Sequence, residues 1–238
     1  MISTLVGGGG VHAVIFDLDE TLLDRRSSAP AFFEAQWTRY AASLPGIDRD
    51  EYVRAAVQLD DNGHSPREEL FTGLGQRFRM SPGLASELLL DFRTLFPAAC
   101  RLFPDVFPTL SALRGAGYRL GMITNGGVLM QGGKISHLGL APAFDTILIS
   151  GAEGVKKPDP QIFLRAVARL GVDPAEAVHV GDNPVADVGG AKTAGLRAIW
   201  RRDGPDAEMP EADAVIDQIG EVLEIVRGWW MEPLPRPS

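Results

Sequence analysis

The chain has one cysteine, Cys100, among its 238 residues. A single thiol cannot form an intrachain disulfide, and it cannot build a metal site from several cysteines. The sequence also lacks any apolar run of the about eighteen residues that a membrane span needs. No Lys or Arg precedes the apolar N-terminal segment, although a signal peptide requires a basic start. We therefore expect a cytoplasmic protein with no membrane partner.

Basic residues are scarce relative to acidic ones. The 23 Lys and Arg residues face 31 Asp and Glu residues, which gives a net charge of −8 and an isoelectric point near 5.0. This balance disfavours a broad nucleic-acid surface, so an anionic ligand would need positive charge supplied by its own site. The composition is otherwise that of a globular protein, with 45% hydrophobic residues. At roughly 150 residues per domain, the length allows one large domain or one and a half.

Short apolar runs alternate with segments of helical periodicity. The runs read as buried strands and comprise Val11–Phe16, Arg119–Ile123, Thr146–Ile149, Ala177–Val180, Arg197–Trp200 and Ala214–Ile216. The helical segments are roughly Phe107–Ala116, Val128–Leu138, Gln161–Leu170, Val185–Ala194 and Ile219–Arg227. This alternation predicts an α/β fold, a doubly wound, Rossmann-like parallel sheet with helices on both faces.

One section interrupts the alternation. Residues from about 28 to 99 contain no good strand and instead show helical patterns, near Pro30–Ala42, Asp50–Asp60, Pro66–Arg79 and Pro82–Phe96. Ser65-Pro66 and Ser81-Pro82 are typical helix starts, with a capping serine and a proline in the first turn. We therefore predict an inserted all-helical domain over residues 25–99, and a core domain formed by residues 1–24 and 100–238.

Polar residues follow the predicted strands where ligands of such sheets bind, beyond the carboxyl ends of the strands. In chain order they are Asp17 and Asp19, then Thr124, Asn125 and Gly126, then Lys156 and Lys157, and finally Asp182 and Asp187. Clustered carboxylates call for a hard cation, and oxygen ligands favour Mg²⁺. Thr124 and the following amides, just before a helix, could bind an anion, and a lysine adds a compact charge. Together these groups suit phosphoryl transfer through an aspartyl-phosphate.

Four segments resemble the motifs of the haloacid dehalogenase-like (HAD) hydrolase superfamily. They are Phe16-Asp17-Leu18-Asp19-Glu20-Thr21, Ile123-Thr124-Asn125, Lys157-Pro158-Asp159-Pro160-Gln161-Ile162-Phe163 and Gly181-Asp182-Asn183-Pro184-Val185-Ala186-Asp187. A lone Asp-x-Asp is weak evidence, but four motifs in order, each at a predicted strand end, are strong. The segment Thr124-Asn125-Gly126, with Lys134-Ile135 and Leu138-Gly139-Leu140, looks most like the phosphatase branch that includes N-acylneuraminate phosphatases and nucleotidases.

The resemblance implies a role for each acidic residue. Asp17 corresponds to the nucleophile and a metal ligand, and Asp19 to the general acid and base, with its backbone carbonyl as a second metal ligand. Asp182 corresponds to a further ligand of Mg²⁺, and Asp187 to a carboxylate behind the ligands. The dehalogenases that named the superfamily usually lack the second aspartate and need no metal, so Asp19 favours a Mg²⁺-dependent phosphatase.

The remaining motif residues correspond to groups that bind phosphate. Thr124 and Asn125 resemble the phosphate-binding second motif. Lys157, directly before a proline, resembles the lysine that balances the charge of nucleophile and phosphate, whereas Lys156 should point elsewhere. The helical insertion resembles the C1 cap of the family, which selects the substrate. The implied function is a phosphomonoesterase that acts on a small phosphorylated metabolite.

Other interpretations stay open. A dehalogenase would use Asp17 on carbon and leave Asp19 and the metal idle, and a receiver-type signalling domain would also gather Asp, Thr and Lys at strand ends. Arg25 and Arg26 fit substrate contacts or a solvated hinge, and His179 fits a packed core histidine. Trp229-Trp230 is typical of helix packing or of an oligomer contact, such as that of a homodimer.

Overall fold

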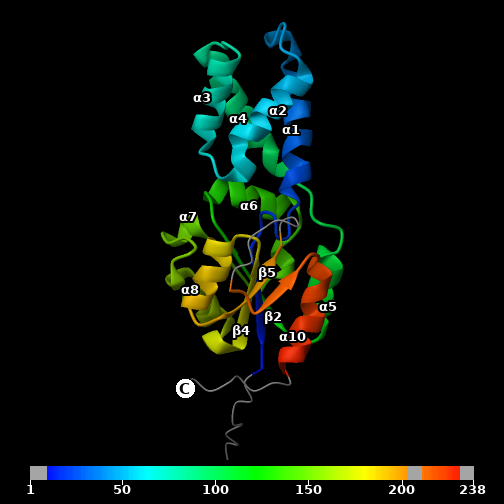
Figure 1. The fold of residues 1–238 in the computed structure, drawn as a ribbon, viewed down its shortest axis with the longest axis vertical. Coiled ribbons are helices and arrows are strands. Elements are labelled where there is room, and N and C mark those ends of the chain that lie inside the picture. Colours follow the sequence, from blue (N-terminus) through cyan, green and yellow to red (C-terminus); the bar gives the residue numbers. More distant parts are fainter. Residues whose placement is uncertain (1–9, 203–210, 231–238) are drawn as a thin grey trace, which may run out of the picture. The chain divides into compact units, whose positions relative to one another are not determined.

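The computed structural model describes residues 10–202 and 211–230. Its sheet is parallel throughout and has the strand order β3-β2-β1-β4-β5-β6 (Figure 1). The strands are β1 (Ala13–Phe16), β2 (Arg119–Thr124), β3 (Thr146–Ile149), β4 (Ala177–Gly181), β5 (Arg197–Arg201) and β6 (Ala214–Ile216). Each of the six predicted strands is present, and the predicted fold class is confirmed.

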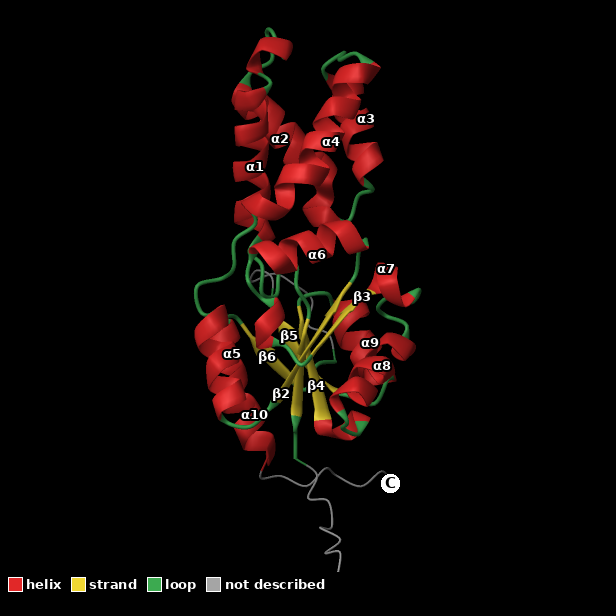
Figure 2. Ribbon diagram, turned by 180° about the vertical axis from the view of Figure 1, so that it is seen from behind, coloured by secondary structure: helices red, strands yellow, loops and turns green. Residues whose placement is uncertain are grey.

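Helices cover both faces of this sheet. They are α5 (Val106–Gly115), α7 (Ser150–Glu153), α8 (Pro160–Leu170), α9 (Gly190–Thr193) and α10 (Val222–Trp230), with a π-helical turn over Pro184–Gly189 before α9. A further helix, α6 (Val128–His137), begins after β2, and its residues from 132 onward belong to the helical unit described below. Figure 2 shows α5 and α10 on one face and α8 and α9 on the other. Within the described ranges, no helix is both long and apolar enough to span a membrane.

The strand sequences explain why both faces are covered. All four residues of β1 are buried, so the strand has no face left for solvent. Ala13 and Ile15 belong to a core that includes Ile162 and Phe163 of α8. Because side chains alternate along a strand, Val14 points to the opposite face. A strand with two apolar faces needs a helix layer on each side, and the polar residues that follow it stay at the rim.

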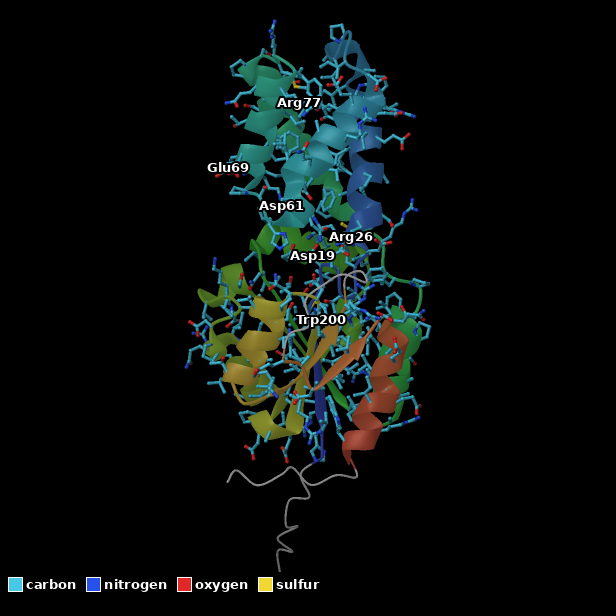
Figure 3. The ribbon with its side chains drawn as sticks, viewed as in Figure 1. Asp19, Arg26, Asp61, Glu69, Arg77 and Trp200 are labelled. Carbon is cyan, nitrogen blue, oxygen red and sulfur yellow. The ribbon has the colours of Figure 1, made fainter. Side chains whose placement is uncertain are left out.

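The chain divides into two compact units. The α/β unit takes the residues up to 22, then 103–131, and then those from 139 onward, whereas the helical unit takes 23–102 and 132–138. The helical unit contains α1 (Arg25–Arg39), α2 (Arg49–Asp60), α3 (Arg67–Arg77) and α4 (Pro82–Ala99). Its core is aromatic: Phe32 meets Phe92 edge-on at 5.2 Å, and Phe92 stacks on Phe96 at 4.6 Å. In Figure 3, Arg26 and Asp61 lie at one end of this unit and Arg77 lies toward the other.

Two expectations for the insertion differ from the structure. Ser65 does not cap α3, because Pro66 has an extended ψ of 136° and the helix begins one residue later. Ser81 does cap α4, where its hydroxyl accepts from the Leu84 amide. Arg25 is neither solvated nor exposed, since its guanidinium donates to Asp60 at 2.7 Å inside the helical unit. A buried charge needs such a partner.

The C-terminal tryptophans bear on the expected oligomer contact. The guanidinium carbon of Arg197 lies 4.9 Å from the ring of Trp229, so this ring contacts β5 within the α/β unit. The side chain of Trp230 lies outside the described residues. Helix packing accounts for Trp229, and a homodimer stays a prediction.

Candidate active site

Three carboxylates meet at the carboxyl end of the sheet. Asp17 follows β1 and Asp182 follows the adjacent strand β4, while Asp187 lies in the π-helical turn after β4. The Asp17 amide donates to Val180 at 2.9 Å, so the parallel pairing continues past β1 and carries Asp17 alongside β4. One carboxylate oxygen from each residue lies within 4.8 Å of the others. The sheet therefore brings the first and fourth motifs together.

The approach of Asp187 depends on a missing side chain. A Cβ at Gly181 would lie 2.3 Å from Cγ of Asp187, so only glycine fits at this position. Asp187 is 1% exposed and its oxygens are well occupied. Its Oδ1 accepts from Lys157 at 2.6 Å and from His179 at 2.9 Å, and its Oδ2 accepts from the Asn183 amide at 3.0 Å. These bonds fit a carboxylate that orients its neighbours, as the sequence predicts for Asp187.

Lys157 connects the nucleophile candidate to Asp187. Its ammonium is buried and lies 2.5 Å from Oδ1 of Asp17 and 2.6 Å from Oδ1 of Asp187. The neighbouring Lys156 is exposed and has no such contact. Burial alone would lower the pKa of Lys157, but the two carboxylates raise it above its ordinary value. Lys157 therefore carries a permanent positive charge at the position that the third motif predicts.

Burial also governs the ionisation of the carboxylates. It raises the pKa of Asp17 to about 7, and the Lys157 ammonium offsets only part of that rise. Burial, followed by the charge of Asp17, raises the pKa of Asp182 to about 8. Burial acts on Asp187 in the same direction, but Lys157 and His179 lower its pKa below the ordinary value. Asp187 is thus ionised at neutral pH, whereas Asp17 and Asp182 titrate together near neutrality.

The cluster fits a divalent cation. Three ionised carboxylates and one ammonium leave a charge of −2, counted over Asp17, Asp182, Asp187 and Lys157. A cation with charge +2 would balance that charge and lower the pKa values of Asp17 and Asp182. The ligands offered are oxygens alone, which Mg²⁺ prefers. Because the oxygens of Asp187 are occupied, Asp17 and Asp182 are the residues best placed to hold the ion.

Asp19 and Thr124 are joined by a residue that the sequence reasoning missed. Gln131 of α6 donates from Nε2 to Oδ2 of Asp19 at 2.9 Å and to Oγ1 of Thr124 at 2.5 Å. Thr124 is buried, whereas Asp19 is half-buried, as a side chain that meets solvent and substrate requires. The only sequence signal for Gln131 was its place in the first turn of the helix after the second motif.

Asn125 contacts the loop of the third motif. Its Nδ2 donates to the Lys157 carbonyl and its Oδ1 accepts from the Lys157 amide, both at 3.0 Å. Both ends of the side-chain amide are therefore used on protein backbone. The second hydrogen of Nδ2 and the backbone amide are both left for the phosphate contact predicted for Asn125, while the side chain also positions Lys157.

The end of β5 supports two of the functional loops. The indole of Trp200 donates to the Asp182 carbonyl at 2.7 Å, and Arg201 donates to the Glu20 carbonyl at 2.6 Å. Glu20 has a φ of +57°, which is strained for a residue with a side chain. Figure 3 shows Trp200 and Asp19 at this end of the sheet. Neither supporting residue has a sequence signal, because the contacts span 18 and 181 positions.

His179 packs as predicted but also meets the cluster. Its ring lies edge-on to Phe163 at 5.1 Å, and burial lowers its pKa. A neutral imidazole beside a carboxylate must carry its hydrogen on Nε2, which therefore donates to Asp187. Among the described residues, the candidate metal ligands at this site are Asp17, Asp182 and Asp187, and His179 is not one of them.

Comparison with known proteins agrees with this geometry. A model of the haloacid dehalogenase-like hydrolase family matches residues 11–195. A glyceraldehyde 3-phosphate phosphatase from Methanopyrus kandleri is 32% identical over 233 residues, which cover 91% of this chain and 97% of the relative.

Two solved structures are each 31% identical to this chain. A HAD phosphatase from Thermococcus onnurineus superposes with a TM-score of 0.65 and covers 93% of this chain and 100% of its own. A 2-haloacid dehalogenase from Pseudomonas syringae superposes with a TM-score of 0.61 and covers 92% and 99%. The fold is thus similar to that of a phosphatase and to that of a dehalogenase, and the site residues must distinguish between these two activities.

Proposed function

Because this chain belongs to the haloacid dehalogenase-like hydrolases, we propose that it is a Mg²⁺-dependent phosphomonoesterase that acts on a small phosphorylated metabolite. The observation that carries the proposal is the clustering of three carboxylates around one ammonium, which when ionised leave two negative charges and so favour a divalent cation. A dehalogenase would use Asp17 on carbon and leave Asp19 and the metal idle. The phosphatase named among the similar proteins supports the same substrate class.

The first half of the reaction transfers the phosphoryl group to the protein. Asp17 attacks phosphorus in line, a bond forms from its carboxylate oxygen to phosphorus, and the bond from phosphorus to the ester oxygen breaks. Asp19 gives its proton to that leaving oxygen. The Lys157 ammonium and the Thr124 hydroxyl stabilise the charge on the transferring group. Asp17 and Asp182, with the backbone carbonyl of Asp19, would hold Mg²⁺, which would supply positive charge to the transferring group.

The second half returns the enzyme to its starting state. Asp19, now ionised, takes a proton from water, and the resulting hydroxide attacks the phosphorus of the aspartyl-phosphate. The bond from phosphorus to the Asp17 oxygen breaks and releases inorganic phosphate. Both halves use Asp19 within reach of one phosphoryl group, which explains why a second aspartate two residues after the first is needed.

We assign substrate choice to the helical insertion, residues 25–99, as a C1-type cap. Its expected partner is a small phosphate ester and not a nucleic acid, in line with the net charge of −8. Substitutions in the insertion should change kcat/KM by different factors for different esters. A cytoplasmic location and a homodimer stay predictions.

The test is a panel of phosphate esters assayed for phosphate release with Mg²⁺, with EDTA-treated protein as the control. Metal-dependent turnover of at least one ester is expected. Halide release from 2-haloacids without metal would favour a dehalogenase. Stable phosphorylation by a phosphodonor without turnover would favour a receiver-type domain.

A further inference from the structure

Gln131 places one buried amide between two groups of the active site. The residue is 2% exposed and lies in the first turn of α6. Its Nε2 lies 2.9 Å from Oδ2 of Asp19 and 2.5 Å from Oγ1 of Thr124. Asp19 comes from the loop after β1 and Thr124 ends β2, so a single side chain ties two strand ends together.

The hydrogen atoms of this contact are assigned by chemistry. An ionised carboxylate only accepts, so the amide nitrogen, with its two hydrogens, must face Asp19. Its second hydrogen goes to Oγ1 of Thr124, which therefore acts as an acceptor toward Gln131. The hydroxyl hydrogen of Thr124 must then point away from Gln131. This orientation makes it available to a phosphoryl oxygen, which only accepts.

A neighbouring glycine, Gly126, leaves room for the Gln131 side chain in this conformation. A Cβ at Gly126 would lie 2.9 Å from Cγ and 3.1 Å from Cδ of Gln131. Gly126 also has a φ of +144°, a backbone conformation that disfavours other residues. Its amide is tied to the Ser150 hydroxyl at 2.9 Å. The glycine after Asn125 therefore leaves the space that the Gln131 side chain occupies.

We infer that Gln131 is a positioning residue, which fixes the Asp19 carboxyl against the leaving oxygen and turns the Thr124 hydroxyl toward the transferring phosphoryl group. The inference rests on the proposed function for its kinetic part. Because this hydrogen bond fixes where the Asp19 carboxyl lies, Gln131 assists proton transfer to poor leaving groups, which depend on it most.

The test compares Gln131→Met and Gln131→Glu with the unmodified protein. Both substitutions keep the length of the side chain and remove its N–H donor, and glutamate also sets a carboxylate against Asp19. The rate of the first step is measured by rapid quench for a series of aryl and alkyl phosphates. Alkyl phosphates should lose on the order of ten- to a hundredfold, whereas p-nitrophenyl phosphate should lose about threefold or less. The dependence of rate on the acidity of the leaving group should therefore steepen.

A second measurement does not need turnover. Calorimetric titration with inorganic phosphate, in the presence of Mg²⁺, should show about five- to tenfold weaker binding in both variants, since the Thr124 hydroxyl is no longer oriented. Gly126→Ala should show the same two changes without removing a functional group. Thr109→Val is the control, because it removes a buried hydroxyl that donates to the Asp105 carbonyl in the α/β unit, away from the insertion. It should change neither the leaving-group dependence nor the affinity for phosphate.

The outcomes separate this inference from the proposed function. If the unmodified protein hydrolyses phosphate esters but both variants lose rate by one common factor, or bind phosphate as before, Gln131 is only a packing residue and the inference is overturned. If the unmodified protein hydrolyses none, the proposed function fails. The phosphate titration then decides alone whether Gln131 orients Thr124.

Discussion

The side chain of Asn125 hydrogen-bonds to both main-chain polar groups of Lys157: it donates to the carbonyl and accepts from the backbone N–H, each at 3.0 Å. Asn125 begins the loop after β2, and Lys157 lies in the loop that follows β3 and α7. The ammonium of the same lysine contacts Asp17 and Asp187. The second motif thus acts on the first and fourth motifs through the backbone of the third.

Asn125→Ala should lower kcat/KM by roughly ten- to a hundredfold, because a freed Lys157 loop misplaces the ammonium. A double-mutant cycle with Lys157→Met tests the route of the effect. If Asn125 acts through Lys157, the alanine substitution should cost little once the ammonium is gone. Fully additive losses would mean instead that Asn125 contacts the substrate itself.

The two adjacent lysines should differ sharply. Lys157→Ala should reduce kcat by on the order of a hundredfold or more, as loss of a key charge-stabilising donor does. The exposed Lys156 provides the matched control, and Lys156→Ala should be mild. Steady-state kinetics on one ester decides the matter, and the reversed order would show that the third motif is displaced by one residue.

The parts of this site that could be predicted are those set by strand ends. Asp17, Thr124 and Asp182 each follow a buried apolar run, so the parallel sheet alone brings them to one rim. Side-chain direction was beyond sequence reasoning. Asn125 was expected to bind phosphate, yet its side chain turns to the Lys157 backbone, and this depends on how two loops meet after folding.

The missed residues share a physical cause. Gln131, Trp200 and Arg201 lie on elements that read as ordinary helix or strand, and each supports a loop from a different part of the chain. The sequence around such a residue shows only the pattern of its own helix or strand. It carries no information about the distant loop that the residue contacts. The start of α3 lies one residue after the predicted one, because Pro66 has an extended ψ of 136° and precedes the first helical residue.

The metal-free protein should lose stability as pH rises from about 4, the ordinary pKa of an aspartate, to about 8. The folded-state pKa values of Asp17 and Asp182 are raised to about 7 and about 8, so the folded state binds more protons than the unfolded state in this range. Stability that depends on those protons is present at low pH and is lost as pH rises through the folded pKa values. Chemical denaturation of EDTA-treated protein at several pH values measures the slope.

Asp182→Asn should flatten that slope and provides the control. Saturating Mg²⁺ should abolish it, because the cation binds the ionised carboxylates and displaces their protons. For each proton that Mg²⁺ binding displaces, the apparent affinity for Mg²⁺ should rise by up to about tenfold per pH unit. A metal-free protein of constant stability over this range would contradict the raised pKa values.

Trp200→Phe should weaken Mg²⁺ binding without removing a ligand. The indole N–H donates to the Asp182 carbonyl, and phenylalanine keeps the ring buried but leaves that carbonyl without this donor. The Mg²⁺ concentration for half-maximal activity should rise about three- to tenfold, since one hydrogen bond is worth about 1 kcal/mol. The rate at saturating Mg²⁺ should hardly change.

Trp37→Phe is the matched control for that substitution. Trp37 also donates its indole N–H to a backbone carbonyl, that of Ile47 at 3.2 Å, but inside the helical unit. Its removal should cost similar stability and leave the Mg²⁺ requirement unchanged. A shift of equal size in both variants would point to general loosening of the fold.

Asp19→Asn should separate the two chemical steps. Asparagine cannot give a proton to an alkyl leaving group, so hydrolysis of alkyl phosphates should stop at the first step. p-Nitrophenolate leaves without that proton, and the first step with its ester should largely survive. The second step then lacks its general base and should slow by roughly 10²–10⁴-fold. The variant should release a burst of nitrophenolate approaching one equivalent per active site and retain phosphate on Asp17. Stopped-flow absorbance and mass spectrometry of the quenched protein measure the two quantities, with Mg²⁺ affinity checked by calorimetry. Neither a burst nor a phosphorylated Asp17, in a variant that still binds Mg²⁺, would rule out the covalent mechanism.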